Sequence, residues 1–151
     1  MEHLIARLEA EQCSCVIRNG SETLICRERG VKDLYNLYCN RPAFLKGSCL
    51  ADKVVGKGAA ALMALGGVQT VYAGVISLPA FILLKKAGAE VRYGKIAPFI
   101  LNRNQTDWCP LEKRCQHENN LTELFDIIRL FLQEQANLNL KECCIPSGIP
   151  A

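Results

Sequence analysis

Hydrophobic and polar positions in the first third of the chain alternate between helix spacing and strand-like runs. Residues 2–11 carry leucine and isoleucine on one face, which predicts a short amphipathic helix. The apolar runs 13–17 and 23–26 are separated by a segment containing Asn19-Gly20, and Asn-Gly between two such runs predicts a β-hairpin. Apolar residues at helical spacing over 31–38 predict a second helix.

The centre of the chain predicts alternating strands and helices. Residues 48–51 form a short strand-like run, and the Ala- and Gly-rich segment 52–65 predicts a helix that ends at the following glycine pair. Residues 70–76 are almost continuously apolar, as expected for a strand covered on both faces. Ser77 is then a favourable N-cap for another helix, and residues 91–93 predict a further short strand.

The C-terminal third predicts two helices and a tail. Cys109-Pro110 opens a short helix, because proline is favoured at the first helical position. The last helix begins near Asn120, and its apolar residues follow the 3.6-residue period up to about residue 135. We therefore expect one domain over 1–135 and a loosely ordered tail over 136–151.

This order of elements indicates an α/β fold. Strand–helix–strand units at this spacing imply right-handed crossovers and parallel central strands. The antiparallel hairpin at one edge makes the sheet mixed. The predicted architecture is a three-layer α/β/α sandwich around a mixed, mainly parallel sheet.

Composition and charge indicate where the protein is located and which classes of partner it binds. The net charge is +3, and no run of five Lys or Arg residues indicates nucleic-acid binding. Residues 1–12 lack the features of a signal peptide, so we expect a cytoplasmic protein whose nine cysteines are mostly thiols. Residues 58–84 contain no charge, but breaks such as Gly66-Gly67 and Pro79 favour a buried helix, strand and helix over a membrane span.

Two common ligand motifs do not fit. Gly56-Lys57-Gly58 lacks the Ser or Thr and the first Gly of a phosphate loop. Cys109 and Cys115 are six residues apart and would lie on different faces of a helix, and neither histidine has a ligand at metal-site spacing. No metal or other cofactor is predicted, although the cysteine count leaves a cysteine-rich metal protein as an alternative.

One candidate site lies at the predicted junction between the strand 48–51 and the next helix. Asp52 and Lys53 occupy the junction, and Lys57 follows one turn later. Ligands of open α/β sheets bind beyond the carboxyl ends of strands, where helix N-termini favour anions. The alternative is that Asp52 is a simple N-cap and the two lysines are solvated.

A second candidate lies in the segment 107–112. Cys109 would cap a helix beginning at Pro110, with Glu112 at the third position. A thiol at a helix N-terminus is favoured as thiolate, which Glu112 would oppose if its carboxylate lies close. The alternative is a buried thiol that only begins a helix.

Four segments resemble a family of uncharacterised prokaryotic proteins assigned to the cytidine-deaminase-like superfamily. The similarity extends over roughly residues 1–135 and implies the same α/β/α fold. The segments are Ala51-Asp52-Lys53-Val54-Val55-Gly56-Lys57, Val75-Ile76-Ser77 with Pro79-Ala80, Ile100-Leu101-Asn102-Arg103, and Cys109-Pro110-Leu111-Glu112.

The resemblance also implies the loss of a metal site. Zinc deaminases begin two central helices with His- or Cys-Ala-Glu and with Pro-Cys-x-x-Cys. The first motif aligns with residues 50–52 and the second with residues 79–83, which replaces the zinc ligands by Leu50, Ala80 and Leu83. Asp52 takes the place of the proton-shuttling carboxylate. Zinc-dependent hydrolytic deamination is therefore not expected.

Our leading hypothesis is a zinc-free deaminase-like domain with a pocket for a small, nucleotide-like molecule. If the domain is an enzyme, Asp52 would act as a base, Lys53 as a proton donor or anion clamp, and Cys109 as a nucleophile or redox thiol. A non-catalytic ligand-binding or regulatory module is the alternative, and assembly of several copies is left open. Further ligand contacts are expected from Lys57, Ser77, Asn102 and Glu112.

Overall fold

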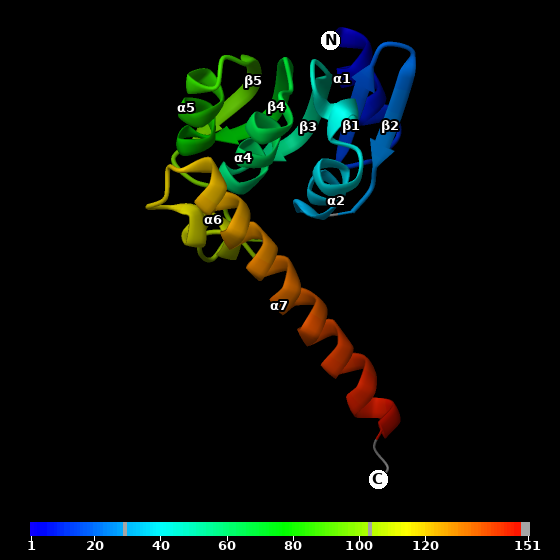
Figure 1. Cartoon of the computed structure of the whole chain (residues 1–151), viewed down its shortest axis with the longest axis vertical. Helices are drawn as coiled ribbons and strands as arrows, with labels where there is room; N and C mark the ends of the chain where they lie inside the picture. Colours follow the sequence, from blue (N-terminus) through cyan, green and yellow to red (C-terminus); the bar gives the residue numbers. More distant parts are fainter. Residues whose placement is uncertain (29, 103, 149–151) are drawn as a thin grey trace.

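The computed structural model describes residues 1–28, 30–102 and 104–148 and forms a five-stranded sheet flanked by helices (Figure 1). In chain order the elements are α1 (Glu2–Ala10), β1 (Cys15–Asn19), β2 (Glu22–Cys26), α2 (Lys32–Asn40), α3 (Pro42–Leu45), β3 (Cys49–Val55), α4 (Lys57–Gly66), β4 (Thr70–Ser77), α5 (Leu78–Lys86), β5 (Glu90–Ala97), α6 (Pro110–Cys115) and α7 (Leu121–Gly148).

The strand order is β2-β1-β3-β4-β5, and it confirms a mixed sheet, although two of the four strand pairings are parallel and two are antiparallel, so the sheet is not mainly parallel as predicted. Strand β1 is antiparallel to both of its neighbours, whereas β3, β4 and β5 are parallel. The hairpin that joins β1 to β2 turns at Gly20, which has a φ of 61° that glycine adopts without a steric penalty. The Asn-Gly pair therefore predicted this edge of the sheet correctly.

The two faces of the sheet are covered unequally. The larger core lies between the sheet and helices α2 to α5, and α7 packs on α4 through the buried Leu124 and Ile128. On the opposite face, α1 packs Leu4 and Leu8 against β1 and β3. Most positions of β5 are half-buried or exposed. The helices thus lie on both sides of the sheet, but the second helical layer consists of α1 alone.

The charge-free segment 58–84 forms most of α4, all of β4 and the first part of α5, as predicted. Helix α4 is buried along nearly its whole length. Its glycines permit close packing, because a Cβ atom at Gly58 would lie 2.7 Å from Leu111 Cδ2. None of the helices in the described ranges has the length and apolarity that a membrane crossing requires.

The predicted boundary between the first parallel strand and its helix is wrong. The strand continues to Val55 and the helix begins at Lys57, so Asp52 and Lys53 are strand residues and Asp52 caps no helix. Val54 and Val55 favour extended backbone, and Gly56 is the N-cap residue of the helix. The prediction placed the helix start at Asp52 because a polar residue before an alanine-rich segment is typical of a helix N-terminus.

Helix α7 also differs from the prediction, because it continues to Gly148 where a loosely ordered tail was expected from residue 136. Its start agrees with the sequence, since the Asn120 side chain accepts a hydrogen bond of 3.1 Å from the Glu123 N–H. Figure 1 shows the helix leaving the body of the domain. Residues 133–138 of the helix are exposed, so this part of α7 lies outside the packed core.

Candidate functional site

A cavity of about 890 Å³ opens beyond the carboxyl end of β3, where the strand meets α4. Its wall is formed by the last residues of β3, the first turn of α4, the segment between β5 and α6, α6 itself and α7. The segments before β1 and after β2 complete the wall. Six of the seven predicted site residues line it, namely Asp52, Lys53, Lys57, Asn102, Cys109 and Glu112. The structure therefore brings three distant segments of the chain together, as the sequence predicted, while the functional roles of these residues stay predictions.

Glu112 forms the polar centre of this region. Its side chain is only 3% exposed, and its two carboxylate oxygens each accept a backbone N–H at 2.9 Å, one from Lys57 and one from Ile100. The Ser77 hydroxyl donates to the same carboxylate at 3.4 Å. One acidic side chain thus joins the start of α4, the start of α5 and the segment after β5.

The favourable position of this carboxylate has a simple electrostatic cause. Unpaired N–H groups and the helix dipole create positive potential at the start of α4, and a carboxylate there is stabilised. Gly56 makes the approach close, since a Cβ atom at this residue would lie 3.2 Å from Glu112 Oε2. The sequence placed Glu112 correctly in the first turn of α6 but did not reveal that it caps α4.

Lys57 is tied to the protein rather than free for a ligand. Its ammonium donates to the Asn119 side-chain oxygen at 3.0 Å and to the Gln116 carbonyl at 3.3 Å. Burial lowers the pKa of this ammonium below its ordinary value. Lys57 lines the cavity and also holds the loop between α6 and α7, and its ligand-binding role stays a prediction.

Ser77 is the N-cap of α5, as predicted, and its hydroxyl accepts the Ala80 N–H at 3.3 Å. The side chain is fully buried and does not line the cavity. The hydroxyl is engaged by the helix start and by Glu112, and its ligand contact stays a prediction.

Asp52 occupies a different environment from the one predicted for a helix cap. It lines the cavity, is 8% exposed and accepts the Val54 N–H at 3.2 Å. Burial raises the pKa of its carboxyl from 3.8 to about 7, and hydrogen bonds from backbone N–H groups only partly oppose this shift. Within the described residues no side chain hydrogen-bonds to it. Asp52 is thus a nearly buried carboxyl that changes charge near neutral pH.

Cationic side chains lie at the rim beside Asp52. Lys53 is exposed, and its backbone N–H donates to the Ser14 carbonyl at 3.1 Å. Arg27 also lines the cavity, just after β2, which lies two strands from β3 in the sheet. Its guanidinium donates to the Glu11 carbonyl and lies 3.5 Å from the Glu11 carboxylate. The sequence did not identify Arg27, because nothing in its local pattern distinguishes it from a solvated arginine.

Cys109 is the N-cap residue of α6, and Pro110 follows it at the first helical position, as predicted. The thiol is half-buried on the cavity wall. The Cys109 N–H donates to the Ile100 carbonyl at 2.7 Å, which ties this residue to the segment that Glu112 also holds.

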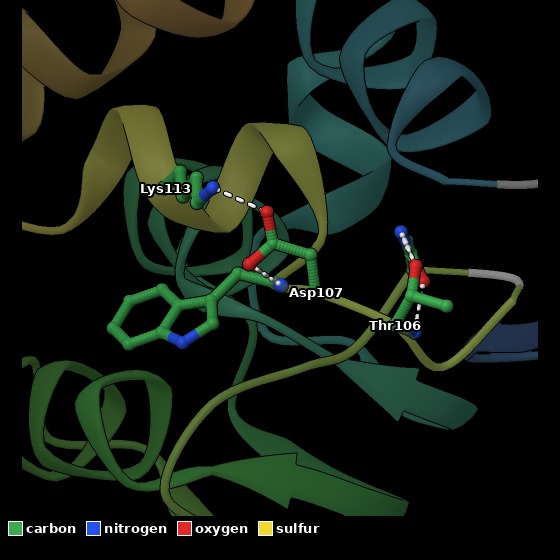
Figure 2. Close-up of polar contacts among 5 residues, drawn as sticks. Thr106, Asp107 and Lys113 are labelled. Atoms are coloured by element: carbon green, nitrogen blue, oxygen red, sulfur yellow. Dashed lines mark hydrogen bonds and ion pairs between the residues drawn. The ribbon is translucent and has the colours of Figure 1, made fainter.

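The segment between β5 and α6 is braced by its own polar side chains. Asn102 both accepts the Thr106 N–H at 3.0 Å and donates to the Thr106 hydroxyl at 3.2 Å. Figure 2 shows Asp107 joining the Trp108 N–H to the Lys113 ammonium. The amide of Asn102 is therefore occupied by its own loop, although the residue lines the cavity.

The metal-ligand alignment is corrected in part by the strand boundary. Leu50 and Asp52 lie within β3, five or more residues before α4, so they do not begin a helix. Ala80 does lie in the first turn of α5, where it is fully buried. Across the described ranges, no group of three or more His, Cys, Asp or Glu side chains is arranged to hold a metal ion.

Comparison with known proteins identifies the family. Residues 3–132 match the TM1506 family, described as a domain of unknown function (DUF1893). The chain belongs to this family. The DUF1893 chain is also similar to the crystal structure of a DUF1893 family protein (TM1506) from Thermotoga maritima, with 28% sequence identity, a TM-score of 0.77 and 88% of each chain covered. No curated protein matches this chain.

We expect Glu112→Ala to lower the free energy of unfolding by about 3 kcal/mol, because it leaves two backbone N–H groups without their acceptor. Glu112→Gln keeps one acceptor oxygen and should lose less. Urea denaturation monitored by circular dichroism measures both changes. Glu134→Ala, which removes an exposed ion pair with Arg114, is the control and should change stability by roughly 0.5 kcal/mol or less. Equal stability of the Ala variant and the parent chain would contradict the capping role of Glu112.

Asp52 predicts a distinctive pH dependence of stability. Below about pH 4 this carboxyl is protonated in both the folded and unfolded states, whereas between about pH 4 and 7 only the folded state holds the proton. The free energy of unfolding should therefore fall as pH rises, with a slope approaching about 1.4 kcal/mol per pH unit from this residue. Asp52→Asn should lose this slope, and Asp126→Asn should retain it in the same denaturation series.

Proposed function

We propose that this DUF1893 domain binds a small, nucleotide-like molecule in the cavity beside β3, with Asp52 as the group that recognises its polar edge. The observation that carries the proposal is the nearly buried Asp52 carboxyl on the wall of a cavity of about 890 Å³. A carboxyl is costly to bury unless it has partners, and this one has only backbone donors among the described residues.

The chemistry of Asp52 suits a ligand that presents both hydrogen-bond donors and acceptors. A protonated carboxyl donates one hydrogen bond and accepts others, whereas the carboxylate only accepts. Because the pKa of Asp52 lies at about 7, both forms are accessible at neutral pH. The amide and amine edges of nucleobases match this pattern, and the same carboxyl can exchange a proton with the bound molecule.

The rest of the wall fits the other parts of such a molecule. Lys53 follows Asp52 in β3 and also lines the cavity. No carboxylate in the described part of the chain pairs with its ammonium. An anionic group such as a phosphate would be attracted to this side chain. Phe131 of α7 adds an aromatic side chain to the wall, and the Arg114 guanidinium lies over its ring at 5.2 Å from the centroid.

The cytidine-deaminase-like relationship remains part of this proposal, in a zinc-free form. Its support is that α4 and α5 begin at one point of the sheet, joined through Glu112, which is where zinc deaminases place their ligands. The first turns of these helices contain no His, Cys, Asp or Glu, and their shared polar position is filled by Glu112. The residues present therefore do not fit a deaminase zinc site.

Cys109 gives the second candidate function, which is thiol-dependent catalysis on the bound molecule. The observation in its favour is a half-buried thiol on the same cavity wall as a carboxyl able to accept a proton. A catalytic cysteine needs a nearby group that promotes the thiolate. A non-catalytic regulatory module would retain the cavity but not this reactivity. We place either activity in the cytoplasm, where cysteines remain thiols.

Isothermal titration calorimetry with cytidine 5′-monophosphate and with cytidine tests the proposed function. We expect the parent chain to bind both, and Asp52→Ala to weaken both by roughly tenfold or more, which corresponds to losing one hydrogen bond to a charged group. Lys53→Gln should weaken the monophosphate more than the nucleoside. The control Lys46→Gln alters an exposed lysine near the opposite ends of the parallel strands and should leave affinity unchanged. Failure of the parent chain to bind either compound would refute the nucleotide-like assignment.

Site-resolved alkylation with iodoacetamide tests the thiol function. Cys109 should react faster than the exposed Cys39 if its environment promotes the thiolate, and cytidine 5′-monophosphate should slow Cys109 alone. The buried Cys115 serves as the unreactive reference, because burial raises the pKa of its thiol to about 12. Alkylation of Cys109 at or below the rate of Cys39 would exclude the catalytic version and leave a binding module.

A further inference from the structure

Three titratable side chains form a row across the sheet behind the cavity. Cys15 on β1 lies directly opposite Cys26 on β2 and directly opposite Asp52 on β3. Both cysteines belong to the larger core, so the row faces α2 and α4 rather than α1. The next pair on the same face, two residues along each strand, is Ile17 and Leu50, and both belong to the larger core, as the two-residue period of a regular sheet requires.

The geometry of the two thiols fits a covalent bond between them. Directly opposed residues of antiparallel strands have Cα atoms about 4.5–5.5 Å apart, which lies within the range of about 4.4–6.8 Å that disulfides occupy. The neighbouring Cys26 side chain, burial and the nearby Asp52 raise the pKa of the Cys15 thiol well above its ordinary value. Both cysteines are thiols in this structure.

We propose that Cys15 and Cys26 are a redox-active pair that forms a reversible cross-strand disulfide by exchange with a small disulfide of the glutathione type. One protein thiolate attacks the small disulfide and releases one small thiol. The second protein thiolate then attacks the mixed disulfide and releases the other. The protein pair loses two electrons and two protons, and the small disulfide gains them as two thiols.

The position of Cys15 and Cys26 determines how a small disulfide gains access to them and which part of the cavity lies beside them. Both thiols are less than 10% exposed, so exchange requires local opening, and β2 is an edge strand with only one neighbour. The residues that follow Cys26 include Arg27, Gly30 and Val31, which line the cavity. The bond would therefore fasten β1 to the strand that leads into the cavity rim, immediately beside Asp52.

Peptide mapping of the whole folded chain after treatment with glutathione disulfide tests this proposal. Cleavage at arginine gives the peptide 8–18, which contains Cys13 and Cys15, and the peptide 19–27, which contains Cys26. We expect these two peptides joined with the loss of two hydrogen atoms, fragment ions that place the bond on Cys15, and full release by dithiothreitol. Cys13→Ser should form the same linked pair.

Two results would overturn the proposal. One is a link from Cys26 to Cys13 in place of Cys15. The other is complete recovery of Cys15 and Cys26 as thiols under conditions in which the exposed Cys39 forms a mixed disulfide with glutathione. Cys15→Ala should abolish the link, and its circular dichroism spectrum verifies that the variant is folded. Because none of these readouts involves a cavity ligand, the outcome is independent of the proposed nucleotide-like function.

Discussion

The bond between the Glu112 carboxylate and the start of α4 is the interaction on which the rest of the site depends. Without an acceptor, the buried N–H of Lys57 and the half-buried N–H of Ile100 would be left unpaired. With it, an element from the last third of the sequence is fixed against the central parallel strands. Cys109 lies three residues before Glu112 and is thereby set on the cavity wall. A single buried acid thus determines where the wall formed by the C-terminal segment meets the wall formed by the sheet.

Much of the fold could be predicted because its signals are local. Asn19-Gly20 between two apolar runs produced the hairpin, and the apolar stripe from residue 121 produced the packed part of α7. The boundary between β3 and α4 could not be placed, because Asp52 resembles a helix cap and is followed by residues compatible with either structure. Its burial depends on the pairing of β3 with β1 and β4, which local sequence does not encode. The same long-range pairing excludes the alternative interpretation of Asp52 as a helix cap and buries its carboxyl, which raises its pKa to about 7.

For the candidate site, the sequence predicted which residues lie together but not which of their side chains already have partners. Convergence of residues from β3, the segment after β5 and α6 followed from the rule that ligand sites gather at the carboxyl ends of parallel strands. Which groups are free could not be read from residue type. Lys57 and Asn102 have side chains suited to ligands, yet Asn119 and Thr106 already engage them. These partners lie in loops whose conformations follow from tertiary packing, so sequence spacing gives no indication of the competition.

The length of α7 has a mechanical consequence. Phe131 belongs to the cavity wall, while the helix continues to Gly148, a further 17 residues or about 25 Å at 1.5 Å per residue. At this length, a tilt of about ten degrees at Phe131 would displace the far end of the helix by about 4 Å. The helix that forms one side of the cavity therefore extends well beyond it, so a small change of its angle at the cavity is enlarged at its far end.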